Sequence, residues 1–570
     1  MSGRAHMTTT LGINDGHDAG AALVRDGKVL AAVQEERVTN IKHYSGVPAI
    51  SINEVFRIAK VDPSEIDGIG LVSLIRVYLP LKERPLKVRL FDSLSPYLHS
   101  KSFTKLYVKI LHRFRKMKEL KKALAPLGLL DKEISFVEHH TAHASCAYRT
   151  SPWGYAEPTL VMTIDGYGDG VSASVNVGRD GEIARIAWST HYDSPGNSYY
   201  SAITEFLGMK PWDHEYKTMG LAPYGRPDIC IDKMRRIIRL NPANPMEFQN
   251  TFRSYSNSMI RKLRTVLAGE RFDNIAAACQ EYYEELFTAW VRNAVTKTGI
   301  RKVAFAGGNI LNVKANQKVL EIQEVEDAFF YPAAGDEGTA TGAALQTYYD
   351  TCQADGAKAE HCPLEDLYYG PEYDNEAIWQ AIKAQDLTAI ATKHGEISHV
   401  VGDLLANQNI VARFDGRLEW GPRALGNRSI LADPRNQRVV RELNTAVKQR
   451  DFWMPFAPTI LEERMHDYLI DARPSRYMIL AFETTEKREE IIAAIHPQDY
   501  TARPQTLNDW NEGYRNVIET FQSATGVGAV LNTSFNLHGY PIVGTPDLAL
   551  WTFKNSGLEY LAIGDYLLKK

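Results

Sequence analysis

Apolar and polar residues alternate in the same order in two stretches of the chain. Residues 11–33 contain an apolar run, an Asp-Gly loop, a second apolar run, an Asp-Gly turn and a third apolar run. Residues 160–186 repeat this order. Short apolar runs separated by Asp-Gly turns indicate β-strands joined by hairpins. We therefore predict two related sheet units, each covered by the helical segments that follow it.

Two glycine-rich turns follow the second repeat. Residues 303–309 indicate a strand that runs into a Gly-Gly-Asn turn, and residues 331–344 hold a second turn rich in Gly and Ala. Small residues let a backbone approach a ligand closely, and a helix N-terminus offers free N–H groups to an anion. A duplicated sheet with such turns resembles the actin and hexokinase superfamily, whose Asp-Gly loops point into a cleft between two lobes. The turns predict a nucleotide site formed by Gly307, Gly308, Asn309, Asn312 and Gly335.

The pattern changes near residues 352–375. Residues 354–360 are polar and helix-forming, and a Gly-Pro-Glu sequence at 370–372 interrupts the chain. A chain of 570 residues is also too long for one hydrophobic core. We predict an α/β protein with two domains, at residues 1–360 and 370–570.

The overall composition is that of a soluble globular protein, with 44% hydrophobic and 24% charged residues. A net charge of -4 gives no general attraction to nucleic acid, so we do not expect a nucleic-acid partner. Five scattered cysteines form no CxxC pair, which favours a reducing compartment over a disulfide framework. No stretch is long and apolar enough to span a membrane, and the N-terminal residues do not resemble a signal peptide. We therefore expect a cytoplasmic protein.

One segment departs from this charge balance. Residues 76–122 contain 14 Lys and Arg against three Asp and Glu, with aromatic residues and Leu between them. One interpretation is the solvated face of an inserted helical hairpin. The other is a contact with an anionic surface, such as membrane headgroups or a phosphorylated acceptor. We refer to residues 76–122 as the basic insert.

His139 and His143 stand four residues apart in the sequence His-His-Thr-Ala-His. In a helix this spacing places both imidazoles on one face, one turn apart, where their nitrogens can bind one ion. Neutral imidazole binds zinc, iron, nickel or copper, and the spacing does not choose among them. The alternative is a hydrogen-bonded pair of histidines in the core.

The C-terminal domain contains two strings with Arg and Lys, at residues 416–430 and 443–450. Arg503 and the sequence Leu-Asn-Thr-Ser-Phe-Asn at residues 531–536 follow later. Guanidinium groups bind phosphate oxygens in pairs, and Lys adds a movable point charge. Amides and hydroxyls can complete such a shell. The strings predict phosphate binding, and surface salt bridges are the alternative.

Four sequence strings together resemble one family, and the match covers nearly the whole chain. The strings lie at residues 139–143, 217–225, 421–429 and 532–536. The family is that of the O-carbamoyltransferases of antibiotic and nodulation-factor biosynthesis. The resemblance implies a duplicated actin-like (ASKHA) N-terminal domain, similar to the tRNA threonylcarbamoyl transferases. It also implies a YrdC-like α/β C-terminal domain, similar to enzymes that make carbamoyl-type adenylates.

The resemblance further implies a reaction in two steps. The C-terminal domain would form carbamoyl-adenylate from carbamoyl phosphate and ATP, with Mg2+ bound to the ATP. The N-terminal domain would then transfer the carbamoyl group to a hydroxyl of a small molecule or glycoside with the help of a divalent metal, Fe2+ in the family. Two imidazoles and two carboxylates leave positions open for the intermediate. Motif matching assigns this metal to His139, His143, Asp165 and Asp336.

Motif matching also places His17 and Lys42 beside the carbamoyl group. His17 is the candidate base that removes the proton of the attacking hydroxyl. Its alternative role is that of a structural loop histidine that orients Asp18. Lys42 is a candidate to stabilise the developing oxyanion, and a surface lysine is the alternative.

In the C-terminal domain the resemblance implies a site for carbamoyl phosphate and ATP at Arg423, Lys448, Arg450, Arg503, Asn532, Thr533 and Ser534. The chain departs from the family pattern at two places. Met454 stands before residues 455–458, where the family often has Arg, and we expect Arg450 to replace that contact. Residues 538–540 read His-Gly-Tyr, where the family commonly has Arg-Gly-Glu.

Other functions fit parts of the sequence. Transfer of threonylcarbamoyl to tRNA is the nearest, although the overall charge gives it little support. A nucleotide-binding scaffold without chemistry and a sugar kinase also fit the fold. A homodimer and a membrane-surface contact through the basic insert are candidate interactions. The acceptor pocket is expected at loops near Tyr199, Tyr200, Trp212, Asp213 and His214.

Overall fold

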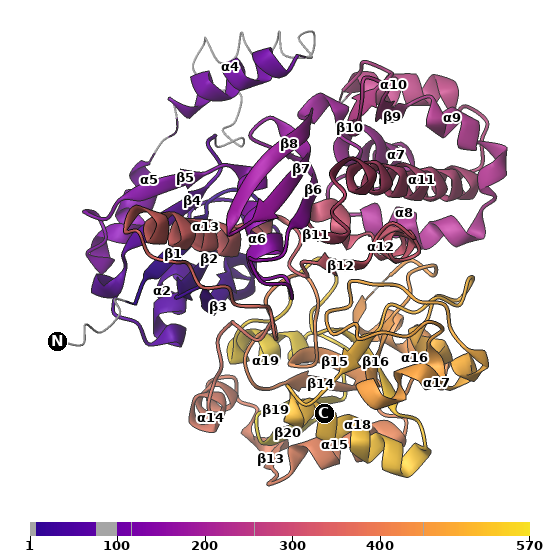
Figure 1. Ribbon diagram of the computed structural model, residues 1–570. Coiled ribbons are helices and arrows are strands. Elements are labelled where there is room, and N and C mark those ends of the chain that lie inside the picture. Colours follow the sequence, from indigo (N-terminus) through magenta and orange to yellow (C-terminus); the bar gives the residue numbers. More distant parts are fainter. Residues whose placement is uncertain (1–6, 76–99, 114, 116, 256, 449) are drawn as a thin grey trace. The chain divides into compact units, whose positions relative to one another are not determined.

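The computed structural model describes residues 7–75, 100–113, 115, 117–255, 257–448 and 450–570 (Figure 1). The chain divides into two compact units. Unit 1 comprises Met1–Ala32 and Ser45–Glu365, and unit 2 comprises Val33–Tyr44 and Asp366–Lys570. The short segment Val33–Tyr44, which the sequence analysis counted with the N-terminal domain, therefore belongs to unit 2.

Unit 1 is built on two five-stranded sheets and a small two-stranded one. The strands of the first sheet are β1 (Thr9–Asn14), β2 (Gly20–Arg25), β3 (Lys28–Gln34), β4 (Gly68–Val72) and β5 (Ile134–Val137). Those of the second are β6 (Thr159–Gly168), β7 (Val171–Arg179), β8 (Glu182–Thr190), β11 (Lys302–Ala306) and β12 (Asp327–Phe330). Strands β9 (Ile238–Asn241) and β10 (Asn244–Asn250) pair separately.

The two larger sheets have the same topology. Their strand orders are β3-β2-β1-β4-β5 and β12-β11-β6-β7-β8. In each sheet the first strand pairs antiparallel with the second and parallel with a later strand. The duplication predicted from the Asp-Gly pattern is therefore confirmed, and its actin-like character stays a prediction.

Helices of unit 1 lie between and around these sheets (Figure 1). The described ones are α2 (Ala49–Ala59), α4 (Lys101–His112), α5 (Lys118–Leu124), α6 (His139–Arg149), α7 (Ala202–Phe206), α8 (Glu215–Leu221), α9 (Ile231–Arg235), α10 (Asn257–Val266), α11 (Phe272–Thr298), α12 (Val313–Leu320) and α13 (Thr339–Ala354). A π-helical stretch at Gly196–Ser201 precedes α7.

Helix α13 packs directly on strand and helix backbones because glycines at the contacts have no side chain. A Cβ atom on Gly12 of β1 would lie 1.9 Å from the carbonyl oxygen of Ala340. Gly342 of α13 approaches the carbonyl oxygen of Ala142 in α6 in the same way, at 2.0 Å from its ideal Cβ position. These contacts bring the start of α13 close to the start of α6.

The described part of the basic insert is helical in α4 and α5, and residues 76–99 lie outside the described residues. Thr104 and Val108 of α4 are buried, and Nζ of Lys101 lies 2.7 Å from the Glu247 carboxylate. Lys105 on the same helix is exposed. The described helices agree with the inserted-hairpin interpretation, and contact with an anionic surface stays a prediction.

Unit 2 is built on one sheet with the strand order β13-β20-β19-β14-β15-β18-β16-β17. The strands are β13 (Ala391–Lys393), β14 (Val411–Phe414), β15 (Arg428–Ala432), β16 (Ala457–Leu461), β17 (Gln505–Leu507), β18 (Ala529–Ser534), β19 (Tyr560–Ile563) and β20 (Tyr566–Lys569). The described helices are α1 (Glu35–Thr39), α14 (Asn375–Ala384), α15 (Ile397–Ala406), α16 (Arg438–Leu443), α17 (Met465–Tyr468), α18 (Glu512–Thr525) and α19 (Pro546–Lys554).

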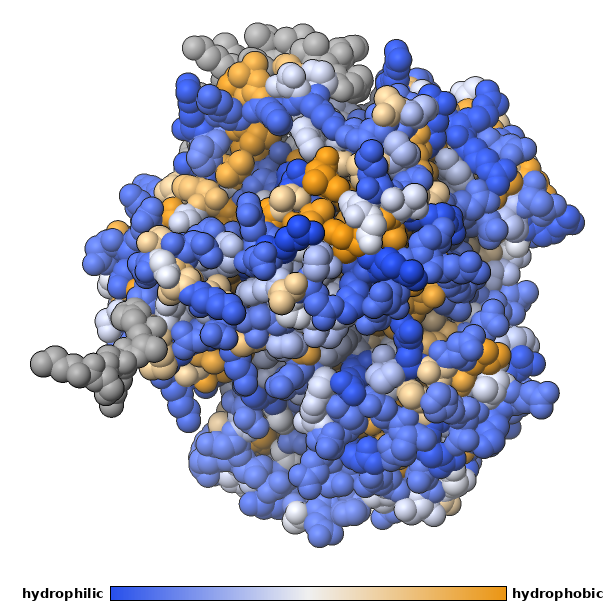
Figure 2. All heavy atoms as spheres, in the orientation of Figure 1, coloured by the Kyte–Doolittle hydropathy of each residue, from blue (hydrophilic) through white to orange (hydrophobic). Residues whose placement is uncertain are grey.

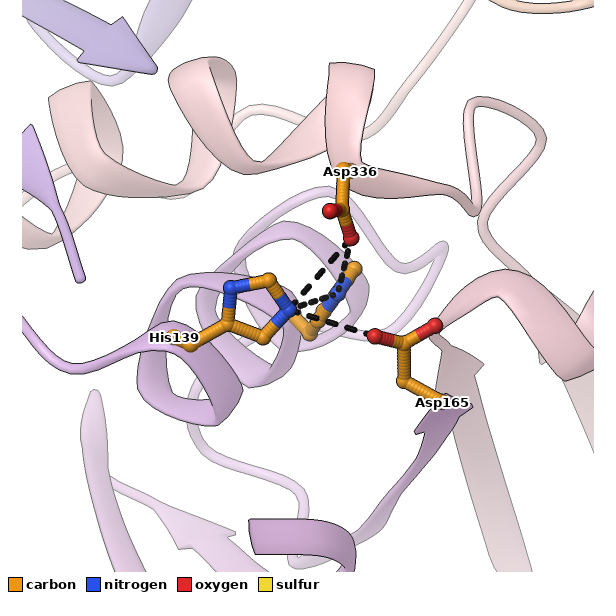
Figure 3. A group of neighbouring side chains, drawn as sticks. His139, Asp165 and Asp336 are labelled. Carbon is orange, nitrogen blue, oxygen red and sulfur yellow. Dashed lines mark hydrogen bonds and ion pairs between the residues drawn. The ribbon is translucent and has the colours of Figure 1, made fainter. Parts of the chain in front are cut away.

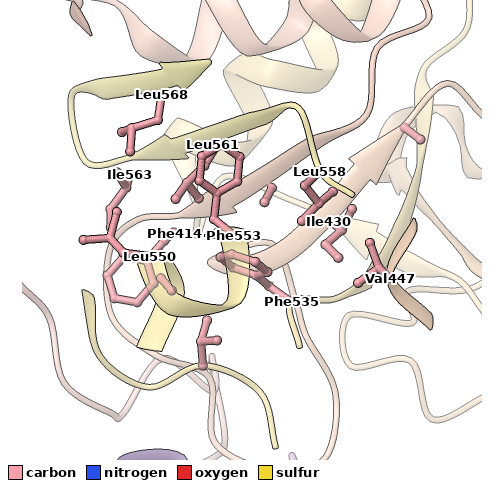
Figure 4. Packing of buried hydrophobic residues seen from close by; sticks show 14 of the residues in the cluster. Phe414, Ile430, Val447, Phe535, Leu550, Phe553, Leu558, Leu561, Ile563 and Leu568 are labelled. Carbon is pink, nitrogen blue, oxygen red and sulfur yellow. The ribbon is translucent and has the colours of Figure 1, made fainter. Parts of the chain in front are cut away.

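The core of unit 2 lies where α19 covers the central strands (Figure 4). Phe553 of α19 packs in one buried cluster with Phe414 of β14, Ile430 of β15 and Leu561 of β19. The mixed sheet confirms the α/β class of this part of the chain. Its likeness to the YrdC enzymes stays a prediction.

Hydrophilic residues predominate on the face of the molecule shown in Figure 2. Within the described residues, no helix combines the length and the apolar character needed to cross a membrane. All five cysteines are described, and each is a free thiol.

Replacing Gly12 with Ala should lower the free energy of unfolding, because the added methyl group would overlap a backbone carbonyl that cannot rotate away. Overpacking of this kind costs about 1–3 kcal/mol. Urea unfolding followed by circular dichroism measures the change. Gly154→Ala is the matched control, since a Cβ atom at Gly154 meets nothing within 4 Å. Equal midpoints for the two variants would contradict the close packing of α13 on β1.

Candidate functional site

Helix α6 begins at His139 because Glu138 caps it. The Glu138 carboxylate accepts a hydrogen bond from the backbone N–H of Thr141 at 2.7 Å, and Nη2 of Arg185 holds the same carboxylate at 2.6 Å. Such a cap satisfies an N–H group that has no partner within the helix. His139 and His143 are both buried and lie one turn apart. The helical placement predicted from their spacing is confirmed.

Asp165 near the end of β6 and Asp336 just before α13 bring two carboxylates to these histidines (Figure 3). The Nε2 atom of His139 lies 3.3 Å from Asp165 Oδ2, 3.4 Å from Asp336 Oδ1 and 3.2 Å from His143 Nε2. One donor atom from each of the four residues lies within 4.8 Å of all the others. The structure thus brings together all four residues that motif matching assigned to a metal.

This set of donor atoms suits a divalent ion. Metal bonds to nitrogen and oxygen of about 2.0–2.2 Å place neighbouring donors roughly 3 Å apart. The separations around His139 Nε2, from 3.2 to 3.4 Å, are close to that value. Imidazole and carboxylate together bind zinc, iron and other first-row metals, so the assignment to Fe2+ stays a prediction.

The charges of the site favour a cation between the two acids. Burial opposes the charged form of His139, but the carboxylates of Asp336 and Asp165 outweigh it and hold the pKa of His139 well above its usual value. Burial and the positive charge of His139 lower the pKa of His143 to about 4. One positive charge is therefore favoured here, and a metal ion would provide it while leaving both imidazoles neutral.

Three residues that the sequence analysis did not identify hold His139 in place. Ser73 Oγ lies 3.2 Å from Nδ1 of the ring, and the Asp169 carboxylate accepts the backbone N–H of His139 at 2.9 Å. Gly168 leaves room for the ring, because a Cβ atom there would lie 2.0 Å from His139 Cγ. The Gly-Asp-Gly sequence at residues 168–170 could have indicated a functional role for Gly168 and Asp169, whereas nothing in the local sequence indicates one for Ser73.

The glycines predicted to bind a nucleotide lie beside the metal ligands. The backbone N–H of Gly308 donates to Asp165 Oδ1 at 3.0 Å, and Gly335 directly precedes Asp336. Gly307 has a φ of 106°, in the region that favours glycine. Gly308 therefore uses its N–H to orient a carboxylate, which is a different role from the predicted phosphate contact.

The two asparagines of the predicted nucleotide site also have partners within the protein. Asn309 Nδ2 donates to the hydroxyl of Tyr283 at 3.1 Å. The side chain of Asn312 caps α12 by accepting the backbone N–H of Ala315 at 3.1 Å. Nucleotide binding by these residues stays a prediction.

The two predicted catalytic residues belong to different units. His17 lies in the loop between β1 and β2 of unit 1, and its Nδ1 is 2.9 Å from Asp18 Oδ2. This contact is the one that the structural alternative for His17 expects, and it also suits a base whose ring is held by a carboxylate. Lys42 follows α1 in unit 2, and its role at the carbamoyl group stays a prediction.

The aromatic loop expected to bind the acceptor contains two packing residues. Tyr199 and Tyr200 are buried, and their hydroxyls donate to acceptors in α11 at 3.0 and 2.6 Å. These two side chains pack in the core, and an acceptor pocket at the neighbouring loops stays a prediction. Trp212, in contrast, is 59% exposed, and its indole N–H donates to Asn197 Oδ1 at 2.7 Å.

Unit 2 gathers three of the predicted arginines. Burial, and then the charges of Arg423 and Arg450, lower the pKa of Arg503 well below its usual range. Nη1 of Arg503 is buried and makes no hydrogen bond within the described residues. Buried like charges are costly unless an anion balances them. The cluster therefore suits the phosphate groups predicted for it.

Lys448 and Arg450 meet the strand that contains the Asn-Thr-Ser sequence. Lys448 Nζ donates to Asn536 Oδ1 at 2.7 Å and to Ser534 Oγ at 3.2 Å, and Arg450 Nη2 donates to Thr533 Oγ1 at 3.3 Å. Burial and the nearby Arg450 lower the pKa of Lys448 well below its usual value. These predicted residues are therefore neighbours, and their contact with substrate stays a prediction.

A buried acid that the sequence analysis missed shapes the loop that contains Arg423. Glu419 Oε1 accepts three backbone N–H groups from residues 425–428, at 2.8, 2.9 and 3.1 Å. Asn532 Nδ2 donates to the carbonyl oxygen of Ala424 at 3.3 Å. Asn532, which was predicted to contact a substrate, therefore helps to hold this loop.

Both parts of the chain match one protein family. Residues 9–345 match the family described as Carbamoyltransferase N-terminus, and residues 402–570 match the one described as Carbamoyltransferase C-terminus. The two matches together cover most of the chain, which therefore belongs to the carbamoyltransferase family and is a transferase.

Individual proteins are similar to the chain over much of its length. Nodulation protein NolNO from Sinorhizobium fredii is 34% identical over 561 residues, which cover 97% of this chain and 79% of that protein. An uncharacterized protein from Synechocystis is 32% identical over 620 residues, 99% of this chain and 97% of its own length. Among solved structures, component A of (R)-2-hydroxyglutaryl-CoA dehydratase from Acidaminococcus fermentans is 15% identical with a TM-score of 0.34, over 60% of this chain and 97% of that one.

Added divalent metal should raise the thermal unfolding midpoint of the wild-type protein, because an ion that binds only the folded state stabilises it. The gain is about 2.7 kcal/mol at a free metal concentration about 100 times the Kd. His143→Ala should lose most of this shift, since the variant lacks one imidazole of the site. His399→Ala, whose ring is exposed in unit 2, is the matched control. An equal shift in the wild type and in His143→Ala would contradict the site.

Proposed function

We propose that the protein is an O-carbamoyltransferase that uses ATP and carbamoyl phosphate to carbamoylate a hydroxyl group of a small molecule or glycoside. The observation that supports this most directly is the convergence of His139, His143, Asp165 and Asp336 in a chain of the carbamoyltransferase family. The arginine cluster of unit 2 is a second support, because both proposed cosubstrates carry phosphate groups.

The first step would form carbamoyl-adenylate in unit 2. A carbamoyl oxygen becomes bonded to the α-phosphorus of ATP, and pyrophosphate and inorganic phosphate leave as one water molecule is consumed. Negative charge accumulates on the phosphate oxygens during this exchange. Arg423, Arg450 and Arg503 would neutralise it through charge-assisted hydrogen bonds, as the balance of charge in their cluster requires.

The second step would transfer the carbamoyl group in unit 1. The acceptor oxygen attacks the carbonyl carbon, the bond to AMP breaks, and the hydroxyl proton moves to a base. His17 is the proposed base, because its Nδ1 lies 2.9 Å from Asp18 Oδ2, and a carboxylate at this distance can orient the ring and stabilise its protonated form. When bound, a divalent ion, expected to be Fe2+, supplies the Lewis acidity that polarises the carbonyl group. His139, His143, Asp165 and Asp336 would hold that ion.

Trp212 is the aromatic residue available to an acceptor. Asn197 binds its indole N–H, and a Cβ atom on Gly166, next to the ligand Asp165, would lie 3.0 Å from the same Asn197 oxygen. The ring is therefore held in place while most of it stays exposed. A fixed, flat apolar surface with a polar edge suits the face of a sugar ring, which supports a glycoside acceptor.

Substitutions in the two units should separate the two steps. His139→Ala should lower carbamoyl transfer from supplied carbamoyl-adenylate by at least about 100-fold, because it removes a ligand of the proposed metal. The same variant should keep the carbamoyl phosphate-dependent exchange of pyrophosphate into ATP. Arg423→Ala should do the reverse, with exchange lowered about 10- to 100-fold through loss of charge-assisted hydrogen bonds.

Exchange is measured with labelled pyrophosphate, and transfer by mass spectrometry of a panel of glycosides incubated with the adenylate. Arg441→Ala is the control for unit 2, since Arg441 is exposed on α16. Circular dichroism verifies that each variant is folded. If His139→Ala and Arg423→Ala lose both activities equally while folded, the proposed division of the reaction between the units is wrong.

A further inference from the structure

Arg115 connects the basic insert to the interior of unit 1. Its guanidinium is only 2% exposed, and Nη2 lies 2.7 Å from Asp15 Oδ1, whose side chain is 4% exposed. Asp15 belongs to the Asp-Gly loop that follows β1. The neighbouring Arg113, in contrast, is exposed. The Arg115 side chain is therefore buried, and a buried charged group is stable only when it is paired with an opposite charge.

The same guanidinium holds the end of β4. Nη2 of Arg115 donates to the carbonyl oxygen of Val72 at 3.0 Å, and Nη1 donates to the carbonyl oxygen of Ser73. Ser73 has a φ of 68°, a left-handed conformation that is rare for residues with a side chain. A strained residue of this kind persists where surrounding contacts fix it, and such residues are common at functional sites. Arg115 supplies one of those contacts.

Ser73 is also in contact with the proposed metal ligand. Its hydroxyl lies 3.2 Å from Nδ1 of His139, and its backbone N–H donates to the carbonyl oxygen of Val137 at 2.8 Å. Ligands of metals in proteins are usually oriented by a partner at the second ring nitrogen. The left-handed backbone of Ser73 therefore directs its hydroxyl to the place where such a partner is needed.

Further contacts tie the insert to the same point. The Asp169 carboxylate accepts the backbone N–H groups of Leu74 at 2.8 Å and Ile75 at 3.0 Å, as well as that of His139. Nδ1 of His112, at the end of α4, lies 2.6 Å from the carbonyl oxygen of Leu74. Leu74 and Ile75, which lie just before the insert, thus share Asp169 with His139, and His112 of the insert contacts Leu74.

We propose that Arg115 is a positioning residue of the metal centre, which fixes Ser73 in its left-handed conformation so that the Ser73 hydroxyl orients the imidazole of His139. The inference rests on the proposed function, because it takes His139 as a metal ligand. It gives the basic insert a structural role in the reaction that is independent of any surface contact through its exposed lysines.

The test is the affinity of the purified full-length protein for Co2+, which reports both binding and coordination geometry through its visible absorption. Arg115→Ala and Ser73→Ala should each weaken Co2+ binding about 10-fold and change the spectrum. The double variant should be no weaker than either single variant, because both changes break the same chain of contacts. Arg113→Ala is the matched control and should bind Co2+ within about twofold of the wild type.

Arg115→Lys covers the case in which Arg115→Ala does not fold. Lysine keeps a positive charge for Asp15 but lacks the branched guanidinium that donates to the carbonyl groups of Val72 and Ser73. Co2+ binding should therefore still be weaker than in the wild type. Wild-type affinity and spectrum in both Arg115 variants would overturn the inference, and so would additive effects of the Arg115 and Ser73 substitutions. Failure of the wild type itself to bind Co2+ would instead overturn the proposed metal centre, and this inference with it.

Discussion

Two carboxylates and two imidazoles share one buried volume in unit 1, and the mutual attraction and repulsion of these groups constrain the structure around them. The proposed ligands come from α6, from the end of β6 and from the turn before α13, so their positions depend on how those elements pack. Asp336 is placed by α13, which packs closely on Gly12 of β1 and, through its own Gly342, on the backbone of α6. Asp165 is oriented by the N–H of Gly308, and His139 by Asp169 and Ser73. A site that must hold its donors to within about 0.5 Å needs such rigid supports.

The cationic cluster of unit 2 presents the opposite problem. Arg423 and Arg450 repel Arg503, and all three residues are only partly exposed. The folded protein tolerates this arrangement because the loop that contains Arg423 is held by Glu419 and Asn532. Like charges that destabilise the free protein and are balanced by a bound anion are typical of a binding site. Functional sites often lose local stability in exchange for binding. Unit 2 should therefore gain stability when phosphate groups bind to it.

Patterns within short stretches of the sequence predicted those features of the structure that depend on residues close together in the chain. The Asp-Gly repeat predicted the first three strands of each five-stranded sheet, and the spacing of His139 and His143 predicted their common helix face. Motif matching brought the two acids to the same site. Contacts between distant parts of the chain could not be found in this way, because no periodicity links Arg115 to Asp15 across 100 residues. The burial of Tyr199 could not be predicted from its sequence either, since an aromatic residue in a loop can equally face a substrate or the core.

The two acids at the Asp-Gly positions of the repeat have diverged in their partners. Asp165, in the second copy, faces an ion-binding cluster, whereas Asp15, at the corresponding place in the first copy, faces the guanidinium of Arg115. The first half thus contains its own countercharge, supplied by the polypeptide, while the second half would take part of its countercharge from the proposed ion. A symmetric duplication has in this way become an asymmetric pair, in which the acid of one loop is neutralised within the chain and the acid of the other faces the proposed metal site.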